Sequence, residues 1–136
     1  MVSSTVEAVR EDGIRAKQQA VSVFSRSGIV DSMPSHAFGV DEAKRRLQES
    51  GGGYEVVHES PGLEVGVYVL VSPEPDRQQP HADDEVYVVL EGSGLLEIEG
   101  EPVQLTEGQA VFVPSGADHG FSAYEQLAVL VIFARR

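Results

Sequence analysis

The second half of the sequence contains four side chains that can bind a metal ion: Gln79, His81, Glu85 and His119. Two histidines and one carboxylate on one side of an ion are typical of non-haem Fe(II) sites, which leave positions open for a substrate and dioxygen. The same ligands accept Mn(II), Ni(II), Co(II), Cu(II) or Zn(II). The amide oxygen of Gln79 is a weaker ligand than an imidazole nitrogen, so Gln79 either coordinates the ion or holds a metal-bound water. We therefore expect one divalent transition metal per chain, with Fe(II) favoured.

The spacing of these residues restricts how they can meet. His81 and Glu85 are four positions apart, and on one straight strand they would lie about 13 Å from each other, too far to share an ion. A helix would bring them together, but Pro80 and the following run VYVVL argue against one. We therefore predict a turn at residues 82–84, after which Glu85 opens the next strand beside His81. His119 belongs to the other half of the domain, so it can join the site only if the sheet closes on itself.

From Tyr54 onward, short runs of β-branched and aromatic residues alternate with turn residues, which is typical of an antiparallel sandwich or barrel. Turns are expected at residues 91–94, 99–101 and 114–118, where glycine and other turn formers gather. Closing so many short strands into a small barrel is the simplest way to leave no sheet edge exposed. We predict strands at residues 54–58, 63–71, 77–81, 85–91, 94–99, 102–105, 110–113, 119–124 and 127–134.

Residues 1–50 differ from the remainder of the chain in pattern and charge. Weak helical periodicity over residues 1–30 indicates an arm, and the run DEAKRRLQES at residues 41–50 predicts a short amphipathic helix with two acidic residues in its first turn. Residues 1–50 are neutral overall, so residues 51–136 carry the whole net charge of −12. We therefore divide the chain into an N-terminal arm, residues 1–50, and an all-β domain, residues 51–136.

Strand alternation indicates which side chains line the inside of the barrel. Tyr87 and Val89 share a face with Glu85, and Phe121 shares a face with His119. In the preceding strand, residues 110–113, either Ala110 and Phe112 or Val111 and Val113 face inward. These apolar residues either form the core or contact a substrate. The substrate pocket expected from alternation is formed by Arg77, Tyr87, Val89, Phe112, Phe121 and Tyr124.

Polar side chains in this pocket can act on a substrate. A buried phenol near a metal can donate a hydrogen bond to a bound oxyanion or act as an acid, which makes Tyr87 and Tyr124 candidates. We take Tyr87 and Glu85 as the predicted catalytic residues. Arg77 has the same parity as Gln79 and would pair with a substrate carboxylate if it points inward.

The chain resembles the cupins over residues 54–136. The first cupin motif runs His, any residue, His, three or four residues, Glu, six residues, Gly, and the matching positions here are Gln79, His81, Glu85 and Gly92. In the second motif the matching positions are Gly108, Pro114, Gly116 and His119. Three positions depart from the family pattern, namely Pro73, Gln79 and Ala123. The resemblance implies an antiparallel double-stranded β-helix, or jelly-roll barrel, with a divalent metal inside, and it favours a homodimer.

Three classes of function remain open. The first is a dioxygenase-like oxidoreductase that acts on a small organic molecule, which the set of two histidines and one carboxylate favours. The second is a redox-neutral isomerase, lyase or hydrolase in which the ion polarises a carbonyl group. The third is a non-catalytic module that binds a small ligand. Membership of a fold family does not decide among them.

Composition excludes several partners. An acidic domain repels nucleic acids and anionic membranes, because binding to phosphates depends on basic residues. No apolar run approaches the roughly 20 residues of a membrane-spanning helix, and the N-terminal segment lacks the basic-then-apolar order of a secretory signal. The sequence has no cysteine and hence no disulfide or thiolate metal site. We therefore expect a cytoplasmic protein whose partners are a small-molecule substrate and a second copy of itself.

Overall fold

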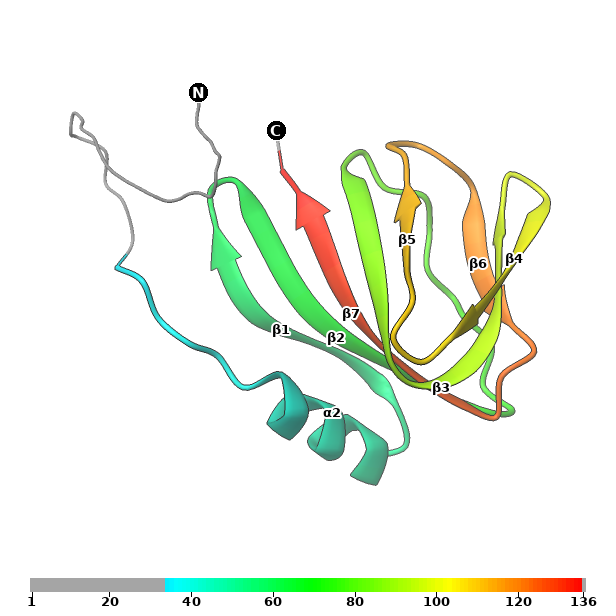
Figure 1. Ribbon diagram of the computed structural model, residues 1–136, viewed down its shortest axis with the longest axis horizontal. Helices are drawn as coiled ribbons and strands as arrows, with labels where there is room; N and C mark the ends of the chain where they lie inside the picture. Colours follow the sequence, from blue (N-terminus) through cyan, green and yellow to red (C-terminus); the bar gives the residue numbers. More distant parts are fainter. Residues whose placement is uncertain (1–33, 136) are drawn as a thin grey trace. The chain divides into compact units, whose positions relative to one another are not determined.

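The computed structural model describes residues 34–135, so most of the expected N-terminal arm, residues 1–33, lies outside the described residues. Within the described range there is one helix, and it is too short and too polar to cross a membrane. Figure 1 shows the order of the elements along the chain. They are α2 (Val40–Glu49), β1 (Gly53–Ser60), β2 (Leu63–Val71), β3 (Asp84–Ile98), β4 (Glu101–Thr106), β5 (Ala110–Val113), β6 (His119–Ser122) and β7 (Gln126–Ala134).

All strand pairs are antiparallel, and they form two layers that share β3. In the first layer the order is β1-β2-β7-β3-β5, with the first half of β3 between β7 and β5. In the second layer the second half of β3 lies between β4 and β6. Figure 1 shows β3 running through both layers. The all-β antiparallel class predicted from the sequence is therefore confirmed for the described residues.

The strand β3 is continuous where the sequence predicted two strands joined by a turn at residues 91–94. The register between β3 and β7 shifts between Val89 and Glu91, and Gly92 adopts a φ of +87°. An extra residue of this kind bends a strand and increases its twist without reversing it. The turn prediction was wrong because a glycine at a bulge has the same sequence signal as a glycine in a hairpin. The hairpin predicted at residues 99–101 does connect β3 to β4.

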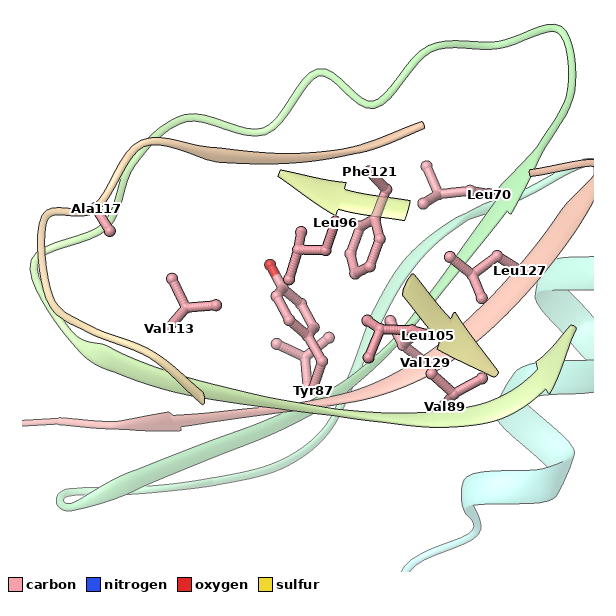
Figure 2. Packing of buried hydrophobic residues seen from close by; sticks show 11 residues of the cluster. Leu70, Tyr87, Val89, Leu96, Leu105, Val113, Ala117, Phe121, Leu127 and Val129 are labelled. Atoms are coloured by element: carbon pink, nitrogen blue, oxygen red, sulfur yellow. The ribbon is translucent and has the colours of Figure 1, made fainter. Parts of the chain in front are cut away.

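The hydrophobic core lies between the two layers. Tyr87 and Val89 from the first half of β3 pack with Leu96 from its second half and Phe121 from β6, and all four are buried. Figure 2 shows these side chains pointing toward one another from opposite layers. Both halves of β3 contribute side chains to this core, so packing in the core fixes the position of one half of the strand relative to the other.

The helix α2 packs on the outer face of the first layer. Its apolar stripe buries Ala43 and Leu47 against the valines of β2 and against Ala128 of β7. Ion pairs add to this contact at Lys44–Glu91 (2.8 Å) and Arg46–Glu55 (2.5 Å). The helix that the sequence predicted at residues 41–50 is present, and it begins and ends one residue earlier. Because it packs on the sheet, it belongs to the same compact unit as the strands, residues 37–135.

The segment between β2 and β3 is a loop where the sequence predicted a strand at residues 77–81. The backbone N–H of Gln78 donates to the carboxylate of Asp76 at 3.3 Å, so it does not bond to a neighbouring strand. The three prolines of this segment have no N–H to donate. The loop therefore passes over the opening between the layers, and it supplies side chains to that opening.

Candidate metal centre

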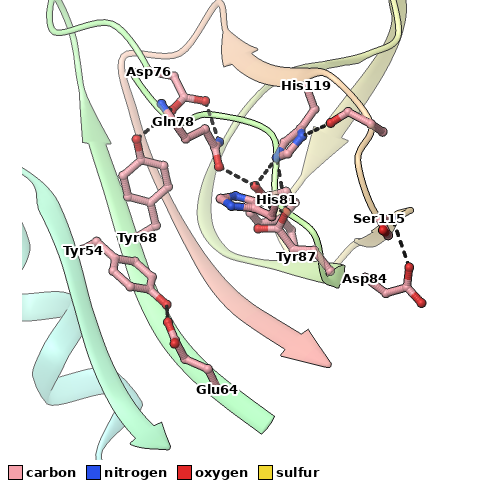
Figure 3. Close-up of polar contacts among 12 residues, drawn as sticks. Tyr54, Glu64, Tyr68, Asp76, Gln78, His81, Asp84, Tyr87, Ser115 and His119 are labelled. Atoms are coloured by element: carbon pink, nitrogen blue, oxygen red, sulfur yellow. Dashed lines mark hydrogen bonds and ion pairs between the residues drawn. The ribbon is translucent and has the colours of Figure 1, made fainter. Parts of the chain in front are cut away.

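His81, Glu85 and His119 meet at one end of the space between the layers. Glu85 Oε1 lies 3.2 Å from Nε2 of His119 and 3.8 Å from Nε2 of His81, and the ligand atoms of the three residues all lie within 4.8 Å of one another. Glu85 and His119 are buried, whereas the side chain of His81 is 30% exposed. Figure 3 shows His81 and His119 approaching each other from separate segments of the chain. The arrangement has the two imidazoles and one carboxylate of a facial metal site.

Local structure explains this convergence. Glu85 is the second residue of β3 and His81 lies in the loop before it, and the chain bends at residues 82–83 between them. The bend falls within the turn predicted at residues 82–84, but it connects a loop to β3 and not one strand to the next. Two hydrogen bonds fasten the turn before β6 to this point: the N–H of Gly116 donates to the carbonyl of His81 at 2.7 Å, and the N–H of Ser115 donates to Asp84 Oδ1 at 2.9 Å. The glycine-containing turn of the second motif thereby places His119 beside Glu85.

The polar atoms of the cluster fit a cation. Nε2 of His81 and both carboxylate oxygens of Glu85 are buried and have no hydrogen-bond partner. His119 donates from Nδ1 to the carbonyl of Ala117 at 2.8 Å, so in the neutral ring the lone pair is on Nε2, which faces Glu85. Buried lone pairs that face one another repel unless a proton or a cation lies among them. A divalent metal would satisfy all of them, and the carbonyl of Ala117 would fix the ring of His119 as outer partners of metal-bound histidines do.

Electrostatics in the metal-free protein follow from the same contacts. Contact with Glu85 raises the pKa of His119 above its ordinary value, although burial opposes this shift. Burial, followed by the negative charge of Glu85, raises the pKa of Tyr87 well above its usual range, so the Tyr87 hydroxyl is protonated. This hydroxyl donates to Gln78 Oε1 at 2.9 Å and lies 3.1 Å from Nε2 of His119. The phenol predicted to lie near the metal is therefore in direct contact with His119, one of the candidate metal ligands.

The cluster opens into a cavity of about 470 Å³, large enough for a small organic molecule. Val131 and Phe133 of β7 give it an apolar wall beside His81 and Tyr87. The ring of Phe133 contacts that of His81 edge-on, with the ring centres 4.9 Å apart. A ligand in this cavity would touch His81 and Glu85 on one side and aromatic or aliphatic surface on the other.

The loop places Gln78, instead of Gln79, in the cavity. Gln79 is exposed and does not line the cavity, whereas Gln78 lines it and holds Tyr87. The expectation for Gln79 assumed the alternation of a strand, and the loop does not follow that alternation. Arg77 does line the cavity, but its side chain is 77% exposed and lies 3.8 Å from Glu74.

The remaining pocket residues expected from alternation lie elsewhere. Val89 and Phe121 are buried in the core between the layers and do not line the cavity. Phe112 is 56% exposed, because β5 turns the opposite parity inward and buries Val113. Tyr124 donates to the carbonyl of Glu74 at the far end of the loop. Of the predicted pocket, the cavity thus contains Tyr87 and Arg77.

Sequence reasoning missed the wall formed by β1 and β2. Tyr54 and Tyr68 line the cavity and donate to carboxylates, Tyr54 to Glu64 at 2.7 Å and Tyr68 to Asp76 at 2.7 Å. The ring of Tyr54 lies over Gly66, where a Cβ would be 2.3 Å from it. The alternation of β2, with Glu64, Gly66 and Tyr68 on one face, was a signal that could have located this wall.

Comparisons with known proteins agree with this architecture. Residues 67–133 match the cupin domain family. An uncharacterized protein of Streptomyces coelicolor is 36% identical over 99 residues, which is 72% of this chain and 94% of that protein. A shorter match, 41% identical over 44 residues, covers 32% of this chain and 29% of the dimethylsulfoniopropionate lyase DddW of Ruegeria pomeroyi.

Among solved structures, a cupin family protein of Methanocaldococcus jannaschii with a double-stranded β-helix fold superimposes with a TM-score of 0.61 at 18% identity. The match covers 76% of this chain and 94% of that one. It confirms the jelly-roll class expected from the two motifs. The family match, together with the motif residues His81, Glu85 and His119 now seen at the candidate metal site, establishes that the chain belongs to the cupin superfamily.

Proposed function

We propose that the protein is a metal-dependent enzyme that oxidises a small organic substrate with dioxygen in the cavity beside His81, Glu85 and His119. The observation that supports this proposal is the set of two imidazoles and one carboxylate whose facing atoms lack hydrogen bonds. A redox-active ion such as Fe(II) bound there would supply electrons for the reduction of dioxygen and open positions for ligands.

The protein's own residues would bind and orient the substrate. Val131 and Phe133 give the cavity an apolar wall that keeps water from the reacting atoms. Tyr87, fixed by Gln78, offers a polar oxygen next to the ligands. Arg77 at the exposed side of the cavity would pair with a substrate carboxylate, since its contact with Glu74 is loose at 3.8 Å.

The metal centre itself is tested by elemental analysis. Wild-type protein incubated without oxygen with Fe(II), Mn(II) or Zn(II), and then dialysed against metal-poor buffer, is expected to retain about one equivalent of at least one ion. The double variant H81A/H119A is expected to retain almost none, because it keeps a single ligand. His58→Ala, which removes an imidazole outside the cavity, serves as the matched control. A wild type that stays empty after all three ions contradicts the proposal and favours a small-ligand-binding module.

A second candidate is a redox-neutral lyase. The match to DddW, a dimethylsulfoniopropionate lyase, favours this class, and so does the Tyr87 hydroxyl at the centre. In such a reaction the ion would polarise a carboxylate or carbonyl oxygen, while a proton and a leaving group depart from neighbouring carbons. Neither dioxygen nor a change in the oxidation state of the ion is needed.

Dependence on dioxygen separates the two candidates. Fe(II)-loaded protein is mixed with a panel of small carboxylates that includes dimethylsulfoniopropionate, and oxygen uptake and product formation are followed with and without air. We expect turnover of at least one compound with oxygen uptake, and loss of that turnover under nitrogen. Release of dimethyl sulfide and acrylate at the same rate without oxygen would instead identify the lyase. H81A/H119A protein is the control for reactions of free iron.

A further inference from the structure

Asp76 is the centre of a hydrogen-bond network behind the cavity. Its Oδ1 accepts from the hydroxyl of Tyr68 at 2.7 Å and from the N–H of Gln78 at 3.3 Å. Its Oδ2 accepts from Nε2 of Gln78 at 2.7 Å and from the N–H of Phe121 at 2.8 Å. All four contacts come from hydrogen-bond donors, and an ionised carboxylate can only accept. Each oxygen of Asp76 therefore accepts two hydrogen bonds. Figure 3 shows Asp76 and Gln78 leading from Tyr68 to the metal centre.

This network determines which way the amide of Gln78 points. Because Nε2 donates to Asp76, Oε1 is on the side of Tyr87, and a carbonyl oxygen can only accept. The Tyr87 hydroxyl has two acceptors in reach, Gln78 Oε1 and, in the metal-free neutral ring, Nε2 of His119. With a metal on Nε2, only Gln78 of these two remains, so the hydroxyl proton is directed to Gln78 and the lone pairs of the same oxygen are on the side of His119.

We propose that Asp76 is a positioning residue that, through Gln78, holds the Tyr87 hydroxyl with its proton turned away from the metal centre and its lone pairs turned toward it. The proposal rests on the proposed metal centre and makes it more specific. Tyr87 then accepts a hydrogen bond beside the metal and does not donate one. The site would favour a ligand that brings its own O–H or N–H next to the ion over a bare anion.

Sequence reasoning assigned Tyr87 the opposite role, that of a donor to an oxyanion. The difference comes from residues in the loop between β2 and β3, whose contacts do not follow from strand alternation. An asparagine at position 76 has one acceptor oxygen where Asp76 has two, and in either orientation its amide group faces an N–H donor, that of Phe121 or that of Gln78. The contacts that fix the Gln78 amide are therefore weakened, the amide can turn over, and the Tyr87 hydroxyl proton is released toward the metal.

Azide binding to the Co(II)-loaded protein tests this direction, because azide is an anion without a proton and Co(II) absorption reports its binding. We expect Asp76→Asn to bind azide about tenfold more tightly than the wild type, since one hydrogen bond to a charged ligand is gained. The double variant D76N/Y87F is expected to lose that gain, and Tyr68→Phe, which removes a different donor to Asp76, to produce none. Unchanged or weaker azide binding in Asp76→Asn overturns the proposal. A gain that persists in D76N/Y87F also overturns it, because the lost negative charge would then be the cause.

A second measurement needs no metal. In nuclear magnetic resonance spectra of the metal-free wild type, the side-chain amide protons of Gln78 are expected to show contacts with the backbone amide proton of Phe121, since both groups donate to the same oxygen of Asp76. Absence of contacts between the Gln78 amide protons and the Phe121 amide proton would overturn the proposal. Failure to bind Co(II) would count against the metal centre alone, because these spectra test the orientation of Gln78 independently.

Discussion

Replacing Glu85 with glutamine is expected to stabilise the metal-free protein and to remove the stabilisation that a metal gives the wild type. Glu85 is 1% exposed, and neither of its oxygens accepts a hydrogen bond. At about pH 9, where an ordinary histidine is neutral, the carboxylate is a buried charge without a partner. The new amide group could donate to Nε2 of His119, which lies 3.2 Å from Glu85 Oε1. We therefore expect the free energy of unfolding of the metal-free variant to rise by about 1–2 kcal/mol.

The same substitution removes the negatively charged candidate ligand, so the variant should gain little stability from metal. With metal present, the wild type is therefore expected to be more stable than E85Q. A ligand at a hundred times its dissociation constant stabilises the folded state by about 2.7 kcal/mol. Chemical unfolding with and without Zn(II) measures both effects, and Glu97→Gln, an exposed change on the same strand, is the matched control. A metal-free E85Q that is less stable than the wild type at about pH 9 would contradict this prediction and would mean that the carboxylate already has a partner, such as a His119 kept protonated by its raised pKa.

Most of the strands and the grouping of His81 with Glu85 were predictable from the sequence because they depend on local signals. Alternation placed Glu85 and Tyr87 on the inner face of one strand, and both are buried there. The four-residue spacing of His81 and Glu85 required a change of chain direction between them, and the chain bends at residues 82–83. The position of His119 could be inferred only from closure of the sheet, which the two motifs together implied.

The loop between β2 and β3 could not be predicted in the same way. Its conformation depends on contacts between segments distant in sequence, such as the hydrogen bond from the N–H of Phe121 to Asp76. Alternation therefore assigned the wrong one of two adjacent glutamines to the cavity, because Gln78 is turned inward by a side-chain hydrogen bond and not by a strand pleat. The pairing of Tyr54 with Tyr68 across β1 and β2 likewise depends on a register that no single strand determines.

The glycine of the first motif provides the last of the large effects that we expect. Gly92 has a φ of +87°, and a Cβ at this position would lie 2.2 Å from the backbone carbonyl oxygen of Gln126. The atoms nearest this Cβ position are backbone atoms of Gln126 and Leu127 in β7, which cannot turn aside as a side chain can. The strands β3 and β7 would therefore have to separate where β3 bends from one layer to the other. Gly100 has a similar φ of +82° with no atom within 4 Å of its Cβ position, and it is the matched control.

We expect Gly100→Ala to cost about 1 kcal/mol of unfolding free energy, from backbone strain alone. Gly92→Ala should cost at least about 3 kcal/mol more, near the upper end of what single substitutions do. Urea unfolding of the metal-free variants measures the difference, and equal losses would mean that the two strands adjust to each other easily. A large loss at Gly92 would have a direct meaning for the site, because the bend in β3 sets the distance between Glu85 in one layer and His119 in the other. The glycine would then serve metal binding by allowing one strand to reach both sides of the centre.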